Sequence, residues 1–123
     1  MIVLEKAEES LNAARLCLER RLYNSATSRA YYAIYQAAEA ALTDAGFHRM
    51  EWSHPGLQAT FTNELIRRRK VYPALFSRYI NRALELRIVA DYRTISISHK
   101  QSAQATQWAE DIIQRVKQRV LHG

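Results

Sequence analysis

Five alanines recur every three or four residues along one stretch of this sequence, a spacing that places them on one side of an α-helix. They are Ala26, Ala30, Ala33, Ala37 and Ala41. Because alanine side chains are short, a partner helix can approach this line closely. Asn24 or Ser25 offers an N-cap, and Gly46 accepts the left-handed conformation that often ends a helix. The sequence therefore predicts a tightly packed helix over about 25–45.

Apolar residues at helical spacing predict further helices on both sides of this one. Their approximate ranges are 3–20, 56–70, 74–92 and 99–121. The stretch 47–55 shows no period and ends in Pro55, so we expect a loop there and a short connection over 93–98. Only three glycines and two prolines interrupt the chain, which favours long helices.

These apolar stripes are most simply buried by packing helix on helix. The side chains expected to face inward are Leu4, Ala7, Leu11, Ala14, Leu18, Leu57, Phe61, Leu65, Phe76, Ile80, Ala83, either Leu86 or Arg87, Ala90, Ala105, Trp108, Ala109, Ile112, Val116 and Val120. The predicted fold is an all-α, up-down antiparallel four-helix bundle, with 56–70 as an additional short helix. We expect residues 1–123 to form a single helical domain.

The composition suggests a basic protein with polyanionic partners. Lysine and arginine number 18 against 12 aspartates and glutamates, for a formal net charge of +6 and a pI of about 9.8. Such a charge favours RNA or an acidic protein surface as a partner. Charged residues follow Met1–Leu4 at once, so neither a signal peptide nor a membrane span is expected there, and we expect a cytoplasmic protein. The single cysteine, Cys17, excludes an intramolecular disulfide.

Four motifs follow one another along the chain. They are the R-x-Y-Y-A pattern of Arg29, Tyr31, Tyr32 and Ala33, His54 ahead of a helix with Phe61, the segment Arg87-Ile88-Val89-Ala90-Asp91-Tyr92, and Trp108-Ala109 in an alanine-rich last helix. In this order and spacing the sequence resembles the small prokaryotic HEPN-domain proteins, over roughly Leu4 to Val120.

This resemblance implies a fold, partners and an activity. Proteins of the family form compact helical bundles, commonly pair as homodimers, and often act with a minimal nucleotidyltransferase as toxin and antitoxin. Active members are metal-independent endoribonucleases that use an arginine followed, after four to six residues, by a histidine. Arg93 and His99 stand at the matching location with five residues between them. Thr94 follows the arginine where Asn or Asp is usual, and Gln101 stands where the nucleotide-modified members carry a tyrosine.

Arg93 and His99 are the candidate catalytic residues. Histidine titrates near neutrality and can act as general acid or base, while arginine can hold a phosphate with two parallel hydrogen bonds. Alternatively, His99 begins a helix and Arg93 is a solvated loop charge. The protein would then be a non-catalytic HEPN adaptor that binds a nucleotidyltransferase or a nucleotide, or a purely structural helical dimer.

Further basic residues are candidates for binding phosphate or RNA: Arg87, Arg29, Arg67, Arg68, Arg69 and Lys70. Each has a structural alternative. Arg87 can pair with Asp91 one helical turn later, with Arg29 facing them from the neighbouring helix. The basic run 67–70 can instead offset the helix dipole. Tyr31, Tyr32 and Tyr35 pack in the interior or face a dimer partner, or alternatively they stack on bases.

No metal site and no cofactor are expected. His48 and His54 flank Glu51, but no second cysteine accompanies them and the spacing does not match a zinc site. The sequence also lacks a glycine-rich phosphate loop and the context of a serine or cysteine triad.

Overall fold

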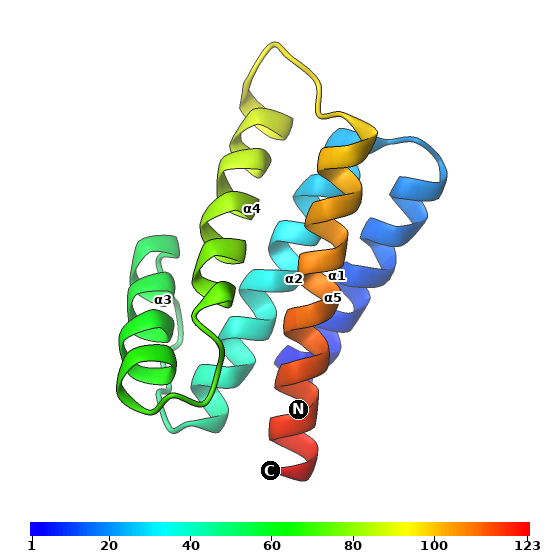
Figure 1. Cartoon of the computed structure of the whole chain (residues 1–123). Helices are drawn as coiled ribbons and strands as arrows, with labels where there is room; N and C mark the ends of the chain where they lie inside the picture. The colour runs from blue at the N-terminus through cyan, green and yellow to red at the C-terminus, as the bar shows by residue number, and fades with distance from the viewer.

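The computed structural model describes all 123 residues and contains helices and connecting segments only. The elements are α1 (Ile2–Glu19), α2 (Tyr23–Asp44), α3 (His54–Thr60), the π-helix η1 (Phe61–Arg68), α4 (Leu75–Tyr92) and α5 (His99–His122). In Figure 1, α1, α2, α4 and α5 run alternately up and down, and α3 with η1 lies on the flank beside α4. The prediction of an all-α up-down bundle with an additional short helical segment is confirmed.

Helix α2 lies at the centre of the bundle. It packs against α1, α4 and α5 and also contacts α3 and η1. All five alanines of its predicted packing line are buried. Because these side chains end at Cβ, they allow α2 to have close neighbours on several sides, as the alanine spacing predicted.

The bundle has one continuous hydrophobic core of 29 buried residues, to which every helix contributes. Most of the predicted inward-facing side chains are buried. The exceptions, Leu18, Ala90, Trp108 and Val120, are half-buried at the edges of their stripes. The helical periodicity therefore identified the core faces correctly.

The predicted N-cap of the second helix is wrong. Helix α2 begins at Tyr23, and Leu22 occupies the N-cap position without a side-chain hydrogen bond. The Asn24 side chain instead accepts a hydrogen bond from the Ile97 backbone N–H at 2.9 Å. A tertiary hydrogen bond to the α4–α5 connection has thus replaced local capping. At the other end of α2, Gly46 has a φ of +96°, as predicted.

The third helical segment begins earlier than predicted and changes its geometry. It starts at His54 rather than near Gly56, because the Ser53 hydroxyl caps it by accepting from the Gly56 N–H at 3.0 Å. Pro55 fits the first turn, where its missing N–H leaves no helical hydrogen bond unmade. From Phe61 the segment continues as a π-helix to Arg68, and Lys70 follows with a φ of +55°.

None of the helices is both long enough and apolar enough to cross a lipid bilayer.

Candidate functional site

Arg93 and His99 lie at the two ends of the segment that connects α4 with α5. Arg93 ends α4: its backbone N–H donates to the Val89 carbonyl at 3.2 Å, and its own backbone is extended. His99 begins α5 directly after Ser98, whose hydroxyl accepts from the Gln101 N–H at 3.1 Å. The Gln101 side chain accepts in return from the Ser98 N–H, which completes a capping box. The chain direction is therefore well defined on both sides of the connection.

Contacts with the start of α2 hold the beginning of α5. Ile97 is buried, and its N–H donates to Asn24. The His99 imidazole lies edge-on to the Tyr23 ring, with 5.4 Å between ring centroids. The Ser102 hydroxyl donates to the Tyr23 carbonyl at 3.3 Å. Together these contacts place His99 beside the α1–α2 connection.

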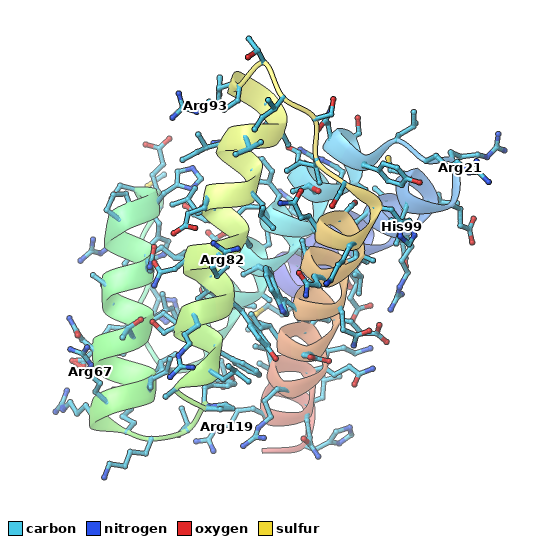
Figure 2. All side chains as sticks on the ribbon, turned by 45° about the horizontal axis from the view of Figure 1, so that its top comes forward. Arg21, Arg67, Arg82, Arg93, His99 and Arg119 are labelled. Carbon is cyan, nitrogen blue, oxygen red and sulfur yellow. The ribbon has the colours of Figure 1, made fainter.

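Within one chain, Arg93 and His99 do not converge. Figure 2 shows Arg93 at the tip of α4, pointing away from the bundle, and His99 on the side of α5 that faces Arg21. Both residues are exposed, and neither side chain has a hydrogen bond or an ion pair within the chain. The two groups therefore do not form one site within the single chain of this structure.

An open hollow of about 450 Å³ lies beside His99. Leu18, Glu19, Arg21 and Tyr23 line it together with the imidazole. Arg21 has a φ of +62°, a left-handed conformation that is uncommon for a long side chain. Arg21 and Tyr23 were not predicted as part of the site, since nothing in the sequence shows that the α1–α2 connection meets the start of α5.

Arg87 lies in a half-buried cluster between α2 and α4. Its Nη2 donates to the Tyr32 hydroxyl at 3.0 Å. Its Nε lies 3.1 Å from the Asp91 carboxylate and forms an ion pair with it, although the N–H is not directed at that oxygen as a hydrogen bond requires. The guanidinium also lies over the rings of Tyr32 and Tyr92, at 5.4 and 5.3 Å. These contacts occupy Arg87 within the chain, as the structural interpretation expected.

Arg29 does not complete the Arg87–Asp91 pair, although it was expected to face it. It is exposed, and its guanidinium lies 5.0 Å from the centroid of the Tyr32 ring. The Asp91 carboxylate receives its second contact from the Ser28 hydroxyl, at 3.1 Å. Arg29 therefore keeps its hydrogen-bond donors free and faces an open groove that Ser28 and Asp91 also line.

His54 packs among the tyrosines of α2. Its Nδ1 is hydrogen-bonded to the Tyr31 hydroxyl, and its ring lies 4.8 Å from the Tyr35 ring. Burial and the nearby Arg87 charge lower the pKa of His54 below its ordinary value, and burial raises the pKa of Tyr31. The Tyr35 hydroxyl donates to the Trp52 carbonyl at 2.6 Å. Tyr31 is buried, which is the interior placement proposed for it, whereas Tyr32 and Tyr35 are half-buried beside it. His54 joins the 45–53 loop to α2 through the Tyr31 hydroxyl.

The basic run 67–70 begins in the last turn of η1, and only some of its members have partners within the chain. Arg69 donates to the Ala45 carbonyl at 3.1 Å, at the C-terminus of α2, and lies over the Phe47 ring. Arg68 pairs with Glu64 at 3.1 Å. Arg67 contacts the Asn63 side chain at 3.5 Å, a weak hydrogen bond, and Lys70 is exposed. Arg67 and Lys70 are therefore the members with the most charge available to a phosphate.

Comparison with known proteins supplies the wider context. Residues 1–119 match the HEPN domain family. The protein named "Putative toxin MJ0605" of Methanocaldococcus jannaschii is 30% identical over 94% of this chain and 84% of its own length. "Putative toxin MJ0142" of the same organism is 33% identical over 81% of this chain and 67% of its own. A UPF0332 protein of Gloeobacter violaceus is 32% identical over 73% of this chain and 69% of its own.

Proposed function

The chain belongs to the HEPN domain family, and on this basis we propose that it is the toxin of a toxin–antitoxin pair, a metal-independent endoribonuclease that acts as a homodimer. Two relatives that align with most of the chain carry the name "Putative toxin". The net charge of +6 suits a protein that must bind an RNA backbone. The resemblance described above supplies a minimal nucleotidyltransferase as the proposed antitoxin.

One observation carries the ribonuclease proposal: Arg93 and His99 are exposed and make no polar contact within the chain. Arg87, Arg68 and Arg69 are all engaged in ion pairs or hydrogen bonds. The arginine and histidine at the family's catalytic spacing are instead free to contact a substrate. A charged group that stabilises a bundle is expected to have a partner, whereas a group that binds phosphate must keep its donors available.

The two side chains together match the chemistry of RNA cleavage without a metal. A neutral His99 imidazole takes the proton of a ribose 2′-hydroxyl, whose oxygen then attacks the adjacent phosphorus. The bond from phosphorus to the 5′-oxygen breaks, and the same His99, protonated in the first step, returns its proton to that oxygen through a water molecule. Arg93 holds the phosphate and neutralises the charge that develops on it. The products are a 2′,3′-cyclic phosphate and a free 5′-hydroxyl.

The arrangement within one chain suggests how the dimer forms the site. Because Arg93 and His99 point in different directions, we place Arg93 of one copy opposite His99 of the second copy. Leu22, Tyr92 and Ile95 are 54%, 69% and 68% exposed on the two connections at this end of the bundle. If a second copy covers these apolar side chains, the α1–α2 and α4–α5 connections of one copy lie close to the same connections of the second copy.

A cleavage assay in the presence of EDTA tests the proposal. Wild type, Arg93→Ala and His99→Ala are incubated with a labelled single-stranded RNA, and the matched control His122→Ala removes an exposed histidine at the far end of α5. We expect both site variants to lose activity by about 100-fold or more, with wild-type activity in the control. Equal cleavage by wild type and His99→Ala rules out the catalytic role of His99.

A second function has a specific observation in its favour. Thr94 replaces the usual Asn or Asp after the arginine, and the two catalytic candidates are apart within one chain. Both features fit a non-catalytic HEPN adaptor that binds a nucleotidyltransferase or a nucleotide. A wild-type protein that cleaves none of a range of RNAs, yet co-purifies stoichiometrically with a co-expressed minimal nucleotidyltransferase, supports the adaptor over the ribonuclease.

A further inference from the structure

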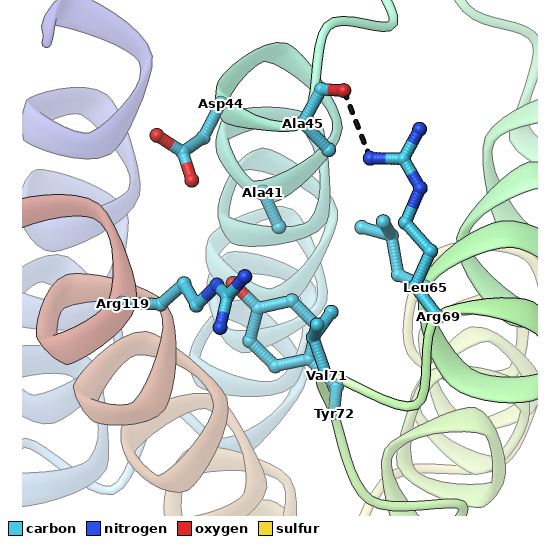
Figure 3. A pocket seen from close by; sticks show the side chains of 8 residues that line it. All are labelled: Ala41, Asp44, Ala45, Leu65, Arg69, Val71, Tyr72 and Arg119. Carbon is cyan, nitrogen blue, oxygen red and sulfur yellow. Dashed lines mark hydrogen bonds between the residues drawn. The ribbon is translucent and has the colours of Figure 1, made fainter. Parts of the chain in front are cut away.

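A cavity of about 200 Å³ lies at the end of the bundle opposite the α4–α5 connection. It is formed where the C-terminus of α2, the segment after η1 and the last turns of α5 meet (Figure 3). Its polar lining comes from Asp44, Arg69, Tyr72 and Arg119, and its apolar lining includes Leu65 and Val71. The site therefore combines charged groups with an apolar wall in a small volume.

The Tyr72 hydroxyl is the most informative group in this cavity. Tyr72 is only 5% exposed, yet its hydroxyl has no hydrogen-bond partner in the chain. The ring is held in place by stacking on Phe61 and Phe76, with centroids 5.5 and 6.3 Å away. Buried polar groups in folded proteins nearly always have a partner, so a fixed and unpartnered hydroxyl beside a cavity indicates a missing one.

The charges around Tyr72 favour an anion as that missing partner. Arg119 has no hydrogen bond or ion pair within the chain. It lines the cavity together with Tyr72, and its charge acts on the Tyr72 hydroxyl (Figure 3). Arg69 uses one nitrogen to bind the Ala45 carbonyl. Arg115 also acts electrostatically on Tyr72, although it does not line the cavity. Of the charged groups that line the cavity, Arg69 and Arg119 are cations and Asp44 is the one carboxylate. The charge of Asp44 acts on the Tyr72 hydroxyl more strongly than that of Arg119 or Arg115.

The cavity also limits the size and the charge of its ligand. At roughly 30 Å³ per water molecule in the liquid, 200 Å³ holds about seven waters. Nucleotides and drug-sized ligands need roughly 300–1,000 Å³. Asp44 disfavours ligands with two negative charges, such as a phosphate dianion, and Leu65 and Val71 favour an apolar portion.

We propose that this cavity binds a small monocarboxylate with a short apolar chain. The carboxylate lies between the Arg119 guanidinium and the Tyr72 hydroxyl, both of which donate to it, and the apolar chain packs on Leu65 and Val71. Arg93 and Arg119 lie at opposite ends of the bundle in Figure 2, so the site is separate from the proposed ribonuclease centre.

Titration of the full chain with butyrate, followed by amide chemical shifts, tests this proposal. Acetate and inorganic phosphate at matched ionic strength serve as comparison ligands. We expect saturable shifts centred on Leu65, Val71 and Tyr72, with butyrate binding more tightly than acetate or phosphate. Tyr72→Phe removes only the hydroxyl and should weaken butyrate binding about tenfold, the cost of a hydrogen bond to a charged group.

Two arginine variants separate a specific site from general attraction. Arg119→Gln should weaken butyrate binding by about tenfold or more, because it removes the planar partner of the carboxylate. Arg115→Gln, one turn earlier on α5, removes the same charge without touching the cavity lining and should change the affinity by less than about twofold. Equal weakening by both variants, unchanged affinity in Tyr72→Phe, or no saturable shift in the wild type would each overturn the proposal.

Discussion

Asn24 holds the α4–α5 connection against the rest of the bundle through one hydrogen bond, which its side-chain oxygen accepts from the Ile97 N–H at 2.9 Å. Ile97 is buried, so this N–H has little access to water. His99 lies two residues later and touches Tyr23, the neighbour of Asn24. A single amide side chain thus contributes directly to the position of a proposed catalytic residue.

Replacing Asn24 with alanine should lower the free energy of unfolding by about 1–2 kcal/mol, because the Ile97 N–H loses its acceptor. Amide hydrogen exchange at Ile97 should become faster as well. Ser25→Ala is the matched control, since Ser25 is the exposed neighbour and its side chain makes no hydrogen bond. Unchanged Ile97 exchange in Asn24→Ala would show that this hydrogen bond does not hold the connection.

His54 provides a second prediction at the scale of single residues. Its pKa in the folded chain is lowered from the ordinary value of 6.5 by burial and by Arg87. The unfolded chain therefore binds a proton at His54 more readily than the folded chain does. The stability that the neutral imidazole contributes is complete above about pH 6.5 and is lost as the pH falls toward the folded-state pKa. Chemical denaturation at a series of pH values from 7.5 to about 5 should show this decline.

The variant His54→Asn keeps an acceptor for the Tyr31 hydroxyl but cannot titrate in this range. We expect the free energy of unfolding to fall less steeply with decreasing pH in this variant than in the wild type. His48→Asn, at an exposed position in the preceding loop, should retain the wild-type slope. Identical slopes in all three proteins would exclude His54 as the source of the pH dependence.

At the scale of whole elements, α2 determines how closely the other helices approach. Ala30, Ala33 and Ala37 are fully buried, between helices on different sides of α2. There is no free volume for a larger side chain at these positions, because helical interiors are packed at close to crystal density. The small size of the residues on α2 is therefore as important as their apolar character.

Replacing Ala37 with leucine should destabilise the protein by about 1–3 kcal/mol through overpacking. Ala59→Leu, at an exposed position on α3, should change the free energy of unfolding by less than about 0.5 kcal/mol. Urea denaturation of the two variants measures both values. A neutral Ala37→Leu would mean that α2 is packed more loosely than the structure indicates.

Helices whose apolar residues recur at regular spacing could be predicted from the sequence. The residues at which these helices begin and end were harder to predict. Local apolar spacing predicts the four bundle helices and the buried face formed by Leu57, Phe61 and Leu65. Turn chemistry predicts the end of α2 at Gly46. The N-cap of α2 could not be predicted in this way, because the Asn24 side chain accepts a hydrogen bond from a residue 73 positions away in the sequence. The π-helix η1 also left no recognisable pattern, because the same apolar spacing fits an α-helix.

For the whole molecule, the sequence proposes residues for the candidate site but does not give their geometry. The family spacing identified Arg93 and His99, and the structure places them in different directions at one end of the bundle. A sequence cannot show this separation, since it depends on how the α4–α5 connection meets the α1–α2 connection. The proposed activity therefore depends on an arrangement between two copies of the chain.

Mixing two inactive variants tests this arrangement most directly. Arg93→Ala and His99→Ala are each purified, mixed in equal amounts, unfolded and refolded together so that subunits exchange, and assayed for RNA cleavage. Random exchange gives a population in which half of the dimers contain one variant of each kind. If Arg93 of one copy acts with His99 of the other, each of these mixed dimers has one intact site. We expect the mixture to recover about a quarter of the wild-type activity. A refolded mixture as inactive as the separate variants, with wild type refolded in parallel fully active, would contradict it.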